Sequence, residues 1–178
     1  MFRWPMIIRG RRLSDGAAIE LDWRVDAREG VGKTSRRSET EGAAMSWDIF
    51  AQDIPADAHK VTEIPDDFEP RPLGSRKVIA ARIRAIVATV EFQDSGWGTV
   101  DEPGCSMEIN LGSSEIVTAV AFHVYGGELA PGIVADLLEQ FGWRALDPAS
   151  ESGFFDSNGA ASSYARWRQY RDRVIENH

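Results

Sequence analysis

The chain changes character at Met45, and this change limits which residues can fold together. Residues 1–44 are rich in arginine, and their apolar residues show only one short alternation, over residues 17–25. From Met45 onward, apolar residues recur with the periods of strands and helices. We therefore expect residues 45–178 to form a single domain. Residues 1–44 are expected to be disordered, or a spurious extension produced by assigning the start codon too early.

The charge divides at the same position. Residues 1–44 carry nine basic and seven acidic side chains, a net charge of +2, whereas residues 45–178 carry eleven and twenty-one, a net charge of −10. Nucleic-acid affinity depends on neutralising phosphates with lysine and arginine, so this acidic domain is not expected to bind DNA or RNA. The same charge favours solubility, and it can also attract a basic partner protein.

The sequence also indicates a cellular compartment. Cys105 is the only cysteine, which excludes an intrachain disulfide and favours the cytosol. The apolar run at the start is too short for a signal peptide, and arginines follow it at once. No stretch approaches the roughly 20 apolar residues that span a bilayer. We predict a cytoplasmic protein that does not bind membranes, and the sequence does not indicate its oligomeric state.

The first half of the acidic domain is predicted to contain a strand, a loop and a helix. Residues 47–51 alternate as a strand does. Prolines interrupt regular structure over residues 55–72. Ser75 is a suitable N-cap for a helix that extends to about Val90. The apolar residues on one face of this helix are Ile79, Ile83, Ile86 and Val90.

The second half begins with strands. Residues 92–97 form a short strand or a turn, and residues 107–111 alternate as a half-buried strand. Residues 116–124 are nearly all apolar and β-branched, which predicts a central strand. Residues 143–146 are a further candidate strand.

Two helices complete the domain. One follows the turn at Gly126-Gly127 and ends just before Gly142, and the other covers residues 160–175. The order of elements predicts an α+β fold, in which about three helices pack largely on one face of a mostly antiparallel sheet of four to five strands.

The segment 27–34, Ala-Arg-Glu-Gly-Val-Gly-Lys-Thr, resembles a relaxed phosphate-binding loop. In such a loop the glycines let backbone amides surround phosphate, Lys33 reaches the outer phosphates and Thr34 holds magnesium. The loop must lie between a strand and a helix, but residues 35–42 have no apolar face on which a helix can pack. We interpret the segment as a chance match and predict no cofactor.

Gly126 and Gly127 are a second candidate for anion binding. They lie between a predicted strand and a helix N-terminus, where backbone amides can surround an anion. Glu128 opposes this function because its carboxylate repels phosphate. The alternative is a tight turn that needs glycine for its backbone conformation.

His123 and Cys105 are the candidate catalytic residues. His123 shares one face of its strand with two alanines, and it can serve as a general base if a carboxylate or nucleophile lies nearby. Cys105 can be that nucleophile if the two strands pair. The alternatives are a histidine beside a closely packed helix and an inert, buried thiol. One histidine and one cysteine do not form a typical zinc site, so no metal is predicted.

The candidates for binding a ligand or partner are Trp97, Arg171 and the loop carboxylates Asp66 and Asp67. Arg171 follows Trp167 by one helical turn and can stack on its indole. The alternatives are a solvated loop for the two aspartates and, for Arg171, an aliphatic stem that passes the core edge. A pocket that joined Trp97, His123 and Arg171 would indicate a ligand site.

From Met45 onward the chain resembles a group of small uncharacterised bacterial proteins that begin Met-Ser-Trp-Asp-Ile. The segments that carry the resemblance start at Met45, Ile64, Phe122, Arg144 and Trp167, and read MSWDI, IPDDF, FHVYGG, RALD and WRQYRD. The resemblance implies a domain that starts at Met45. No activity is assigned to that group, so it implies no functional residue.

Two functional hypotheses follow. The first is a protein-binding module of the immunity or regulatory type, because the domain is small and acidic and has no recognisable catalytic set. The second is a small hydrolase or ligand-binding enzyme with its site around His123, Cys105 and the Gly126-Gly127 turn.

Overall fold

The computed structural model describes residues 9–12, 19–22, 45–93 and 96–176, and the chain divides into two units, residues 1–44 and 45–178. In the first unit, β1 (Arg9–Arg12) pairs with β2 (Ile19–Asp22) as an antiparallel hairpin. The segment 27–34 lies outside the described residues, as does most of the stretch predicted to be disordered or spurious.

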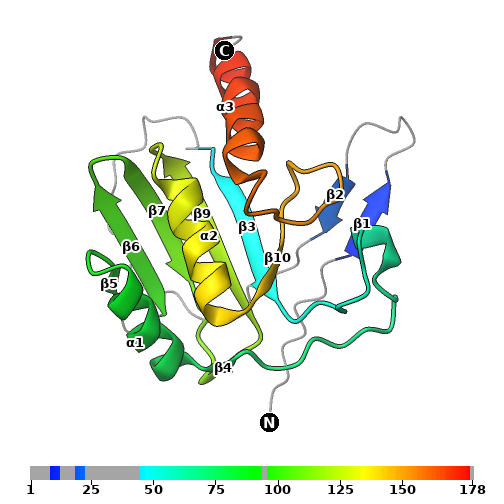
Figure 1. Ribbon diagram of the computed structural model, residues 1–178, viewed down its shortest axis with the longest axis horizontal. Coiled ribbons are helices and arrows are strands. Elements are labelled where there is room, and N and C mark those ends of the chain that lie inside the picture. Colours follow the sequence, from blue (N-terminus) through cyan, green and yellow to red (C-terminus); the bar gives the residue numbers. More distant parts are fainter. Residues whose placement is uncertain (1–8, 13–18, 23–44, 94–95, 177–178) are drawn as a thin grey trace, which may run out of the picture. The chain divides into compact units, whose positions relative to one another are not determined.

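The second unit is built on a six-stranded sheet with the order β10-β3-β9-β7-β6-β5 (Figure 1). Every neighbouring pair is antiparallel, which confirms the predicted α+β class and sheet type. The strands are β3 (Trp47–Gln52), β5 (Glu91–Phe92), β6 (Trp97–Glu102), β7 (Cys105–Asn110), β9 (Ala119–Gly126) and β10 (Arg144–Leu146).

The predicted number of four to five strands was wrong, because β6 is a full strand of six residues. Its core-facing residues are Gly98 and Val100, so only one apolar side chain marks the alternation by which a strand is recognised in a sequence. The glycines around Trp97 are typical of a turn, which hid the strand. A Cβ at Gly98 would lie 2.7 Å from the ring of Phe92, so any larger residue there would have to displace that ring.

The long apolar run at residues 116–124 is divided at Thr118. β8 (Ile116–Val117) pairs with β4 (Gly74–Ser75) in a small separate sheet. The rest belongs to β9, which lies between β3 and β7 as the predicted central strand. β9 extends to Gly126, two residues beyond the predicted end.

Three helices follow the prediction in number and position. They are α1 (Arg76–Ile86), α2 (Ala130–Phe141) and α3 (Ala160–Glu176), and a short 3-10 turn, η1 (Val61–Glu63), lies in the proline-rich loop. α1 ends four residues before Val90, and Ile86 is 38% exposed, so the predicted apolar face is shorter than expected. Gly142 closes α2 in the left-handed conformation, as predicted.

The hydrophobic core lies between one face of the sheet and the helices. Alternate strand residues such as Ile49, Met107 and Phe122 are buried together with residues of all three helices. In Figure 1, α2 crosses in front of the central strands, and its Val134 and Leu137 are fully buried. The helices therefore cover one face of the sheet.

The opposite face of the sheet is named here the open face. It consists of the strand residues that alternate with the core residues, and these are mostly half-buried or exposed. The described helices bury their residues in the core, on the other side. The polar and aromatic members of the open face are Asp48, Phe50, Gln52, Glu91, Trp97, Thr99, Asp101, Ser106, Glu108, Asn110, His123, Tyr125 and, at the β10 edge, Arg144.

A buried carboxyl group ties three parts of the domain together. Asp147, which is 1% exposed, accepts hydrogen bonds from Trp47 Nε1 on β3 at 3.1 Å and from the Ser163 hydroxyl on α3. The backbone N–H of Ala149 donates a third bond at 2.9 Å. Burial raises the pKa of Asp147, while the three hydrogen bonds act in the opposite direction.

Among the described residues, none of the helices combines the length and the apolar composition needed to cross a bilayer.

Candidate functional site

The strand register places His123 between two carboxylates on the open face. On β9, His123 is opposite Asp48 of β3 and opposite Glu108 of β7. Opposed residues in an antiparallel sheet have Cβ atoms roughly 5 Å apart, so the three side chains form one row. We name Asp48, His123 and Glu108 the central row.

Asp48 orients the imidazole of His123. Nδ1 of His123 lies 2.8 Å from Oδ1 of Asp48, and the Ser46 hydroxyl donates to the same oxygen at 2.6 Å. An ionised carboxylate only accepts hydrogen bonds, so Nδ1 carries a hydrogen. No described residue bonds to Nε2, the second ring nitrogen. The side chains of His123 and Asp48 are 22% and 37% exposed, so ligands in solution can reach both.

Trp97 stacks on His123 from a strand two positions away in the sheet. The ring centroids are 5.8 Å apart and the planes differ by 19°. Trp97 is opposite Asn110 on β7, which places it one row from His123, and it is 37% exposed. The structure therefore brings together two of the predicted site residues.

A β-bulge directs Tyr125 toward the central row. Ser106 pairs with Gly126 and Met107 pairs with Val124, so Tyr125 is the extra residue of β9. Bulges bend a strand and re-aim its side chains. The Tyr125 hydroxyl donates to Oε2 of Glu108 at 2.8 Å. This bond fixes one oxygen of the glutamate beside His123.

Arg171 does not join this site. Its guanidinium lies 5.0 Å from the centroid of the Trp167 ring, as the helical spacing predicts, and bonds to the neighbouring Asp172. It reaches the bulge only through the backbone, where Nη1 donates to the carbonyl of Tyr125 at 3.4 Å. Arg171 therefore braces the bulge from the helical side, and no contact joins it with Trp97 and His123.

Cys105 and His123 lie on opposite faces of the sheet. Cys105 is 1% exposed in the core, whereas His123 lies on the open face. Burial, reinforced by the nearby carboxylate of Glu102, raises the pKa of the Cys105 thiol to about 11. A thiol in this setting stays protonated at neutral pH, so the structure does not assemble the predicted cysteine–histidine pair.

The Gly126-Gly127 turn has a packing function. Gly127 has φ +100°, and a Cβ at this position would lie 2.1 Å from the carbonyl oxygen of Gly104. Leu129, the N-cap of α2, also donates its N–H to that oxygen at 2.9 Å. The turn thus packs against the β6–β7 connection, which supports its interpretation as a tight turn.

Asp66 and Asp67 are exposed in the proline-rich loop, in a turn closed by a bond from Phe68 N–H to the carbonyl of Pro65. The loop is anchored by residues other than these two aspartates. Asp53 accepts three hydrogen bonds from Arg71, and these bonds lower the pKa of Asp53. In the described part of the chain, no group of three or more histidine, cysteine or acidic side chains is arranged to hold a metal ion.

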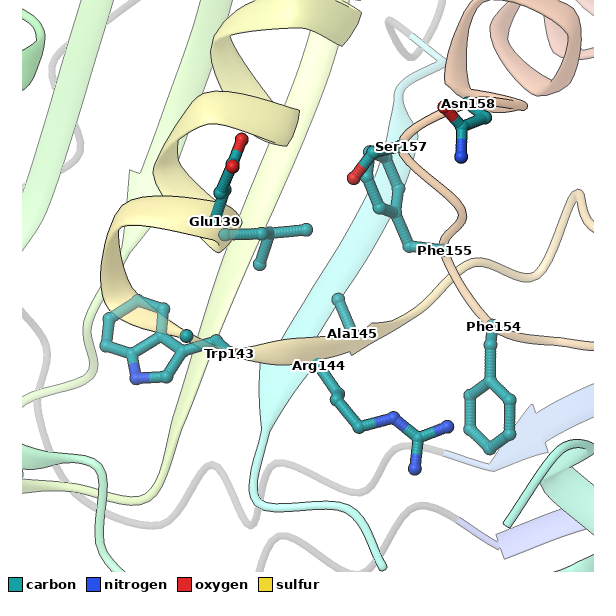
Figure 2. A pocket seen from close by; sticks show the side chains of 10 residues that line it. Glu139, Trp143, Arg144, Ala145, Phe154, Phe155, Ser157 and Asn158 are labelled. Carbon is teal, nitrogen blue, oxygen red and sulfur yellow. The ribbon is translucent and has the colours of Figure 1, made fainter. Parts of the chain in front are cut away.

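A pocket of about 490 Å³ lies at the β10 edge of the sheet, between the last turn of α2 and the loop before α3 (Figure 2). Its size suits a small ligand. Glu139 is its only acidic lining residue, and Phe155 points toward α2. Arg144 points to the other side of β10 and bonds to the carbonyls of Pro55 and Ala58. None of the predicted site residues lines the pocket, and it lies at the opposite end of the sheet from β6.

Sequence reasoning missed Asp48, Glu108 and Tyr125. The signal for the first two was present, because each alternates with buried apolar residues on a predicted strand. Their meeting at His123 depends on the register of three strands, which the sequence alone does not specify. Tyr125 depends on a bulge that no local pattern indicates.

Comparisons of the chain with protein-family models, with curated proteins and with solved structures find no match. The resemblance to the bacterial group that begins Met-Ser-Trp-Asp-Ile stays a prediction, and function has to be argued from the geometry.

Proposed function

We propose that residues 45–178 are a protein-binding module of the immunity or regulatory type, and that the open face binds a basic partner protein. One observation carries the proposal. The strands β3, β5, β6, β7 and β9 contain no lysine or arginine, yet four of their residues on the open face are carboxylates. These are Asp48, Glu91, Asp101 and Glu108.

The basic residues gather on the helices. Eight of the eleven lysines and arginines in residues 45–178 belong to α1 or α3. Arg144, the only basic residue of the sheet, is engaged by loop carbonyls and lies over Phe154. A domain with charge separated in this way orients an approaching basic protein toward its sheet, and like charge disfavours wrong partners.

The open face also has the side chains that protein interfaces use. Aromatic residues are enriched at the centres of such interfaces and contribute much of the binding energy. Trp97 is partly exposed, and Phe50 and Tyr125 are half-buried on the same face. Flanking carboxylates at Asp101 and Glu91 are exposed, as expected of a polar rim.

Site-specific photo-crosslinking tests the proposal. A benzophenone amino acid replaces Thr99, an exposed residue of the open face, in the full chain expressed in the native host, and the crosslinked proteins are identified by mass spectrometry. The matched control carries the same group at Val78, which is 58% exposed on α1. We expect a protein with an excess of lysine and arginine to crosslink from position 99 and not from position 78.

Charge reversal decides whether that capture is specific. Asp101→Lys together with Glu91→Lys is expected to abolish the crosslink, because both side chains are exposed on the open face. Glu176→Lys, at the exposed end of α3, adds positive charge elsewhere and should leave it intact. Equal capture from both positions, or capture that survives the double reversal, would contradict the proposal.

The Asp48–His123 bond favours a second candidate, a small hydrolase. A carboxylate that holds Nδ1 leaves Nε2 to remove a proton from water or from a substrate hydroxyl. The described contacts include no nucleophile beside His123, so water would be the attacking group. This candidate needs a substrate that binds over Trp97.

Hydrolysis of p-nitrophenyl acetate by the full chain tests this candidate. A general base contributes roughly 100-fold or more to the rate, so His123→Ala should lower the rate by that factor. His59→Ala removes an exposed loop imidazole and measures the background reaction of histidine. Equal rates in the two variants would eliminate the hydrolase candidate.

A further inference from the structure

Trp97 has one covered and one exposed side. Its covered side stacks on His123, with 5.8 Å between centroids, and the residue remains 37% exposed. Because Asp48 and Ser46 hold the imidazole, the indole rests on a fixed platform. Such preorganisation reduces the entropy lost on binding. Indole is also the aromatic group that attracts cations most strongly.

A carboxylate lies within reach of a cation on this ring. Glu108 is opposite Thr99 and Trp97 is opposite Asn110, so Glu108 is the diagonal neighbour of Trp97 across the β6–β7 pair. Diagonal neighbours are about 7–8 Å apart, a distance that a long side chain bridges. Tyr125 bonds to Oε2 of Glu108, while the described residues supply no donor to Oε1.

We propose that the open face recognises an arginine side chain of the basic partner, stacked on the exposed side of Trp97 and paired with Glu108. This inference rests on the proposed function and names the group that is recognised. A guanidinium is planar, stacks on aromatic faces and presents a fork of donors that matches a carboxylate. The ammonium of lysine is compact and strongly hydrated, so it fits this pair of groups less well.

The same pairing recurs inside the domain. Arg82 lies 4.1 Å from the centroid of Phe141, and Arg171 lies 5.0 Å from that of Trp167. Three further rings, those of Phe92, Phe154 and Tyr164, each have an arginine within 6 Å of the centroid. Trp97 stacks instead on His123, and among the described residues no arginine lies over it. Its exposed side is therefore left for an arginine from outside.

Other occupants fit the open face less well. A second copy would bring the same five strands without lysine or arginine against the same carboxylates. A phosphate-bearing ligand would meet negative charge at each of these positions. Both kinds of contact are repulsive, which favours a basic protein as the occupant.

Two peptides of equal charge test the inference. The ¹⁵N-labelled full chain is titrated with acetylated hepta-arginine amide and, separately, with hepta-lysine amide, and affinities are taken from shifts of the backbone amide resonances of the open face, which Trp97→Leu retains. We expect hepta-arginine to bind about fivefold tighter, because a guanidinium both stacks flat on the indole and pairs through its fork of donors with a carboxylate, which an ammonium does not. Equal affinities for the two peptides would overturn the inference.

Single-residue variants show which side chains cause the preference for hepta-arginine. Trp97→Leu should bind both peptides equally, whereas Tyr170→Leu, which removes a 54% exposed aromatic ring from α3, should keep the preference. Glu108→Gln keeps an acceptor for Tyr125 and should weaken hepta-arginine more than hepta-lysine. A preference that persists in Trp97→Leu would contradict the inference. Contacts between arginine methylene protons and the Trp97 indole in the wild-type chain provide a readout that needs no variant, and their absence would also contradict it.

These results are distinguishable from failure of the proposed function. If a basic partner crosslinks at position 99 but the two peptides bind equally, only the assignment of an arginine side chain is removed. If neither peptide shifts resonances of the open face, and position 99 captures no basic protein, both proposals fail.

Discussion

Asp147 is the only carboxyl group among the buried side chains of the described residues. An ionised carboxylate is costly to bury unless hydrogen bonds compensate it. Three donors, from Trp47, Ala149 and Ser163, supply that compensation, and the coulombic attraction of Arg166 acts in the same direction. The residue is thus a polar link between β3, the loop after β10 and α3.

The Asp147 carboxyl should make stability depend on pH. Burial raises its pKa in the folded protein, so its contribution is fully present below the ordinary value of 3.8 and is lost as pH rises through the folded pKa. Asp147→Asn retains acceptor and donor groups without ionising. Its stability relative to wild type should therefore improve as pH rises from about 3.8 toward neutrality.

Asp147→Ala provides the contrast. It leaves the Trp47 and Ser163 donors without their partner and should lower the free energy of unfolding by about 2–4 kcal/mol. Urea unfolding of the three proteins between pH 3 and pH 8 measures both effects. A constant difference between Asp147→Asn and wild type across this range would contradict the predicted pH dependence.

At the scale of elements, the connection from β9 to α2 is set by a close backbone approach. Gly126 and Gly127 are adjacent in sequence, but their surroundings differ. No atom lies within 4 Å of a Cβ added at Gly126. A Cβ added at Gly127 would clash with the backbone of Gly104, and the backbone of Gly127 has φ +100°, which side chains other than glycine rarely adopt. The pair therefore offers a matched test of the turn.

Gly127→Ala should lower the free energy of unfolding by at least about 2 kcal/mol, because left-handed strain adds to a clash that backbone atoms do not relieve. Gly126→Ala should change it by about 0.5 kcal/mol or less. Denaturant unfolding followed by circular dichroism measures both changes. Equal losses in the two variants would show that the turn does not pack as described.

For the whole molecule, the division at residues 44 and 45 has a consequence for stability. Every residue of the described core comes from residues 47–167. A chain that begins at Met45 is therefore expected to unfold cooperatively, with a free energy within about 0.5 kcal/mol of the full chain. Guanidinium unfolding followed by far-ultraviolet circular dichroism compares the two. A large loss of stability would show that residues 1–44 contribute to the fold.

The sequence by itself determined the elements with strong local patterns. α2 was predictable because Pro131 and Gly142 mark its ends and apolar residues fill its buried face. β9 was predictable as a central strand because a run of β-branched and aromatic residues is typical of a strand with a neighbouring strand on each side. β6 was missed because Gly98 and Val100 give too little contrast with its polar residues.

Only the tertiary structure decided the candidate site. His123 could be picked from the sequence, but whether it meets Cys105 or Asp48 depends on which face it occupies and on the register of its neighbours. A shift of one residue moves every side chain of a strand to the other face. Long-range pairing is set by how the whole core packs. That packing placed Cys105 inside and His123 outside, between Asp48 and Glu108 and beneath Trp97.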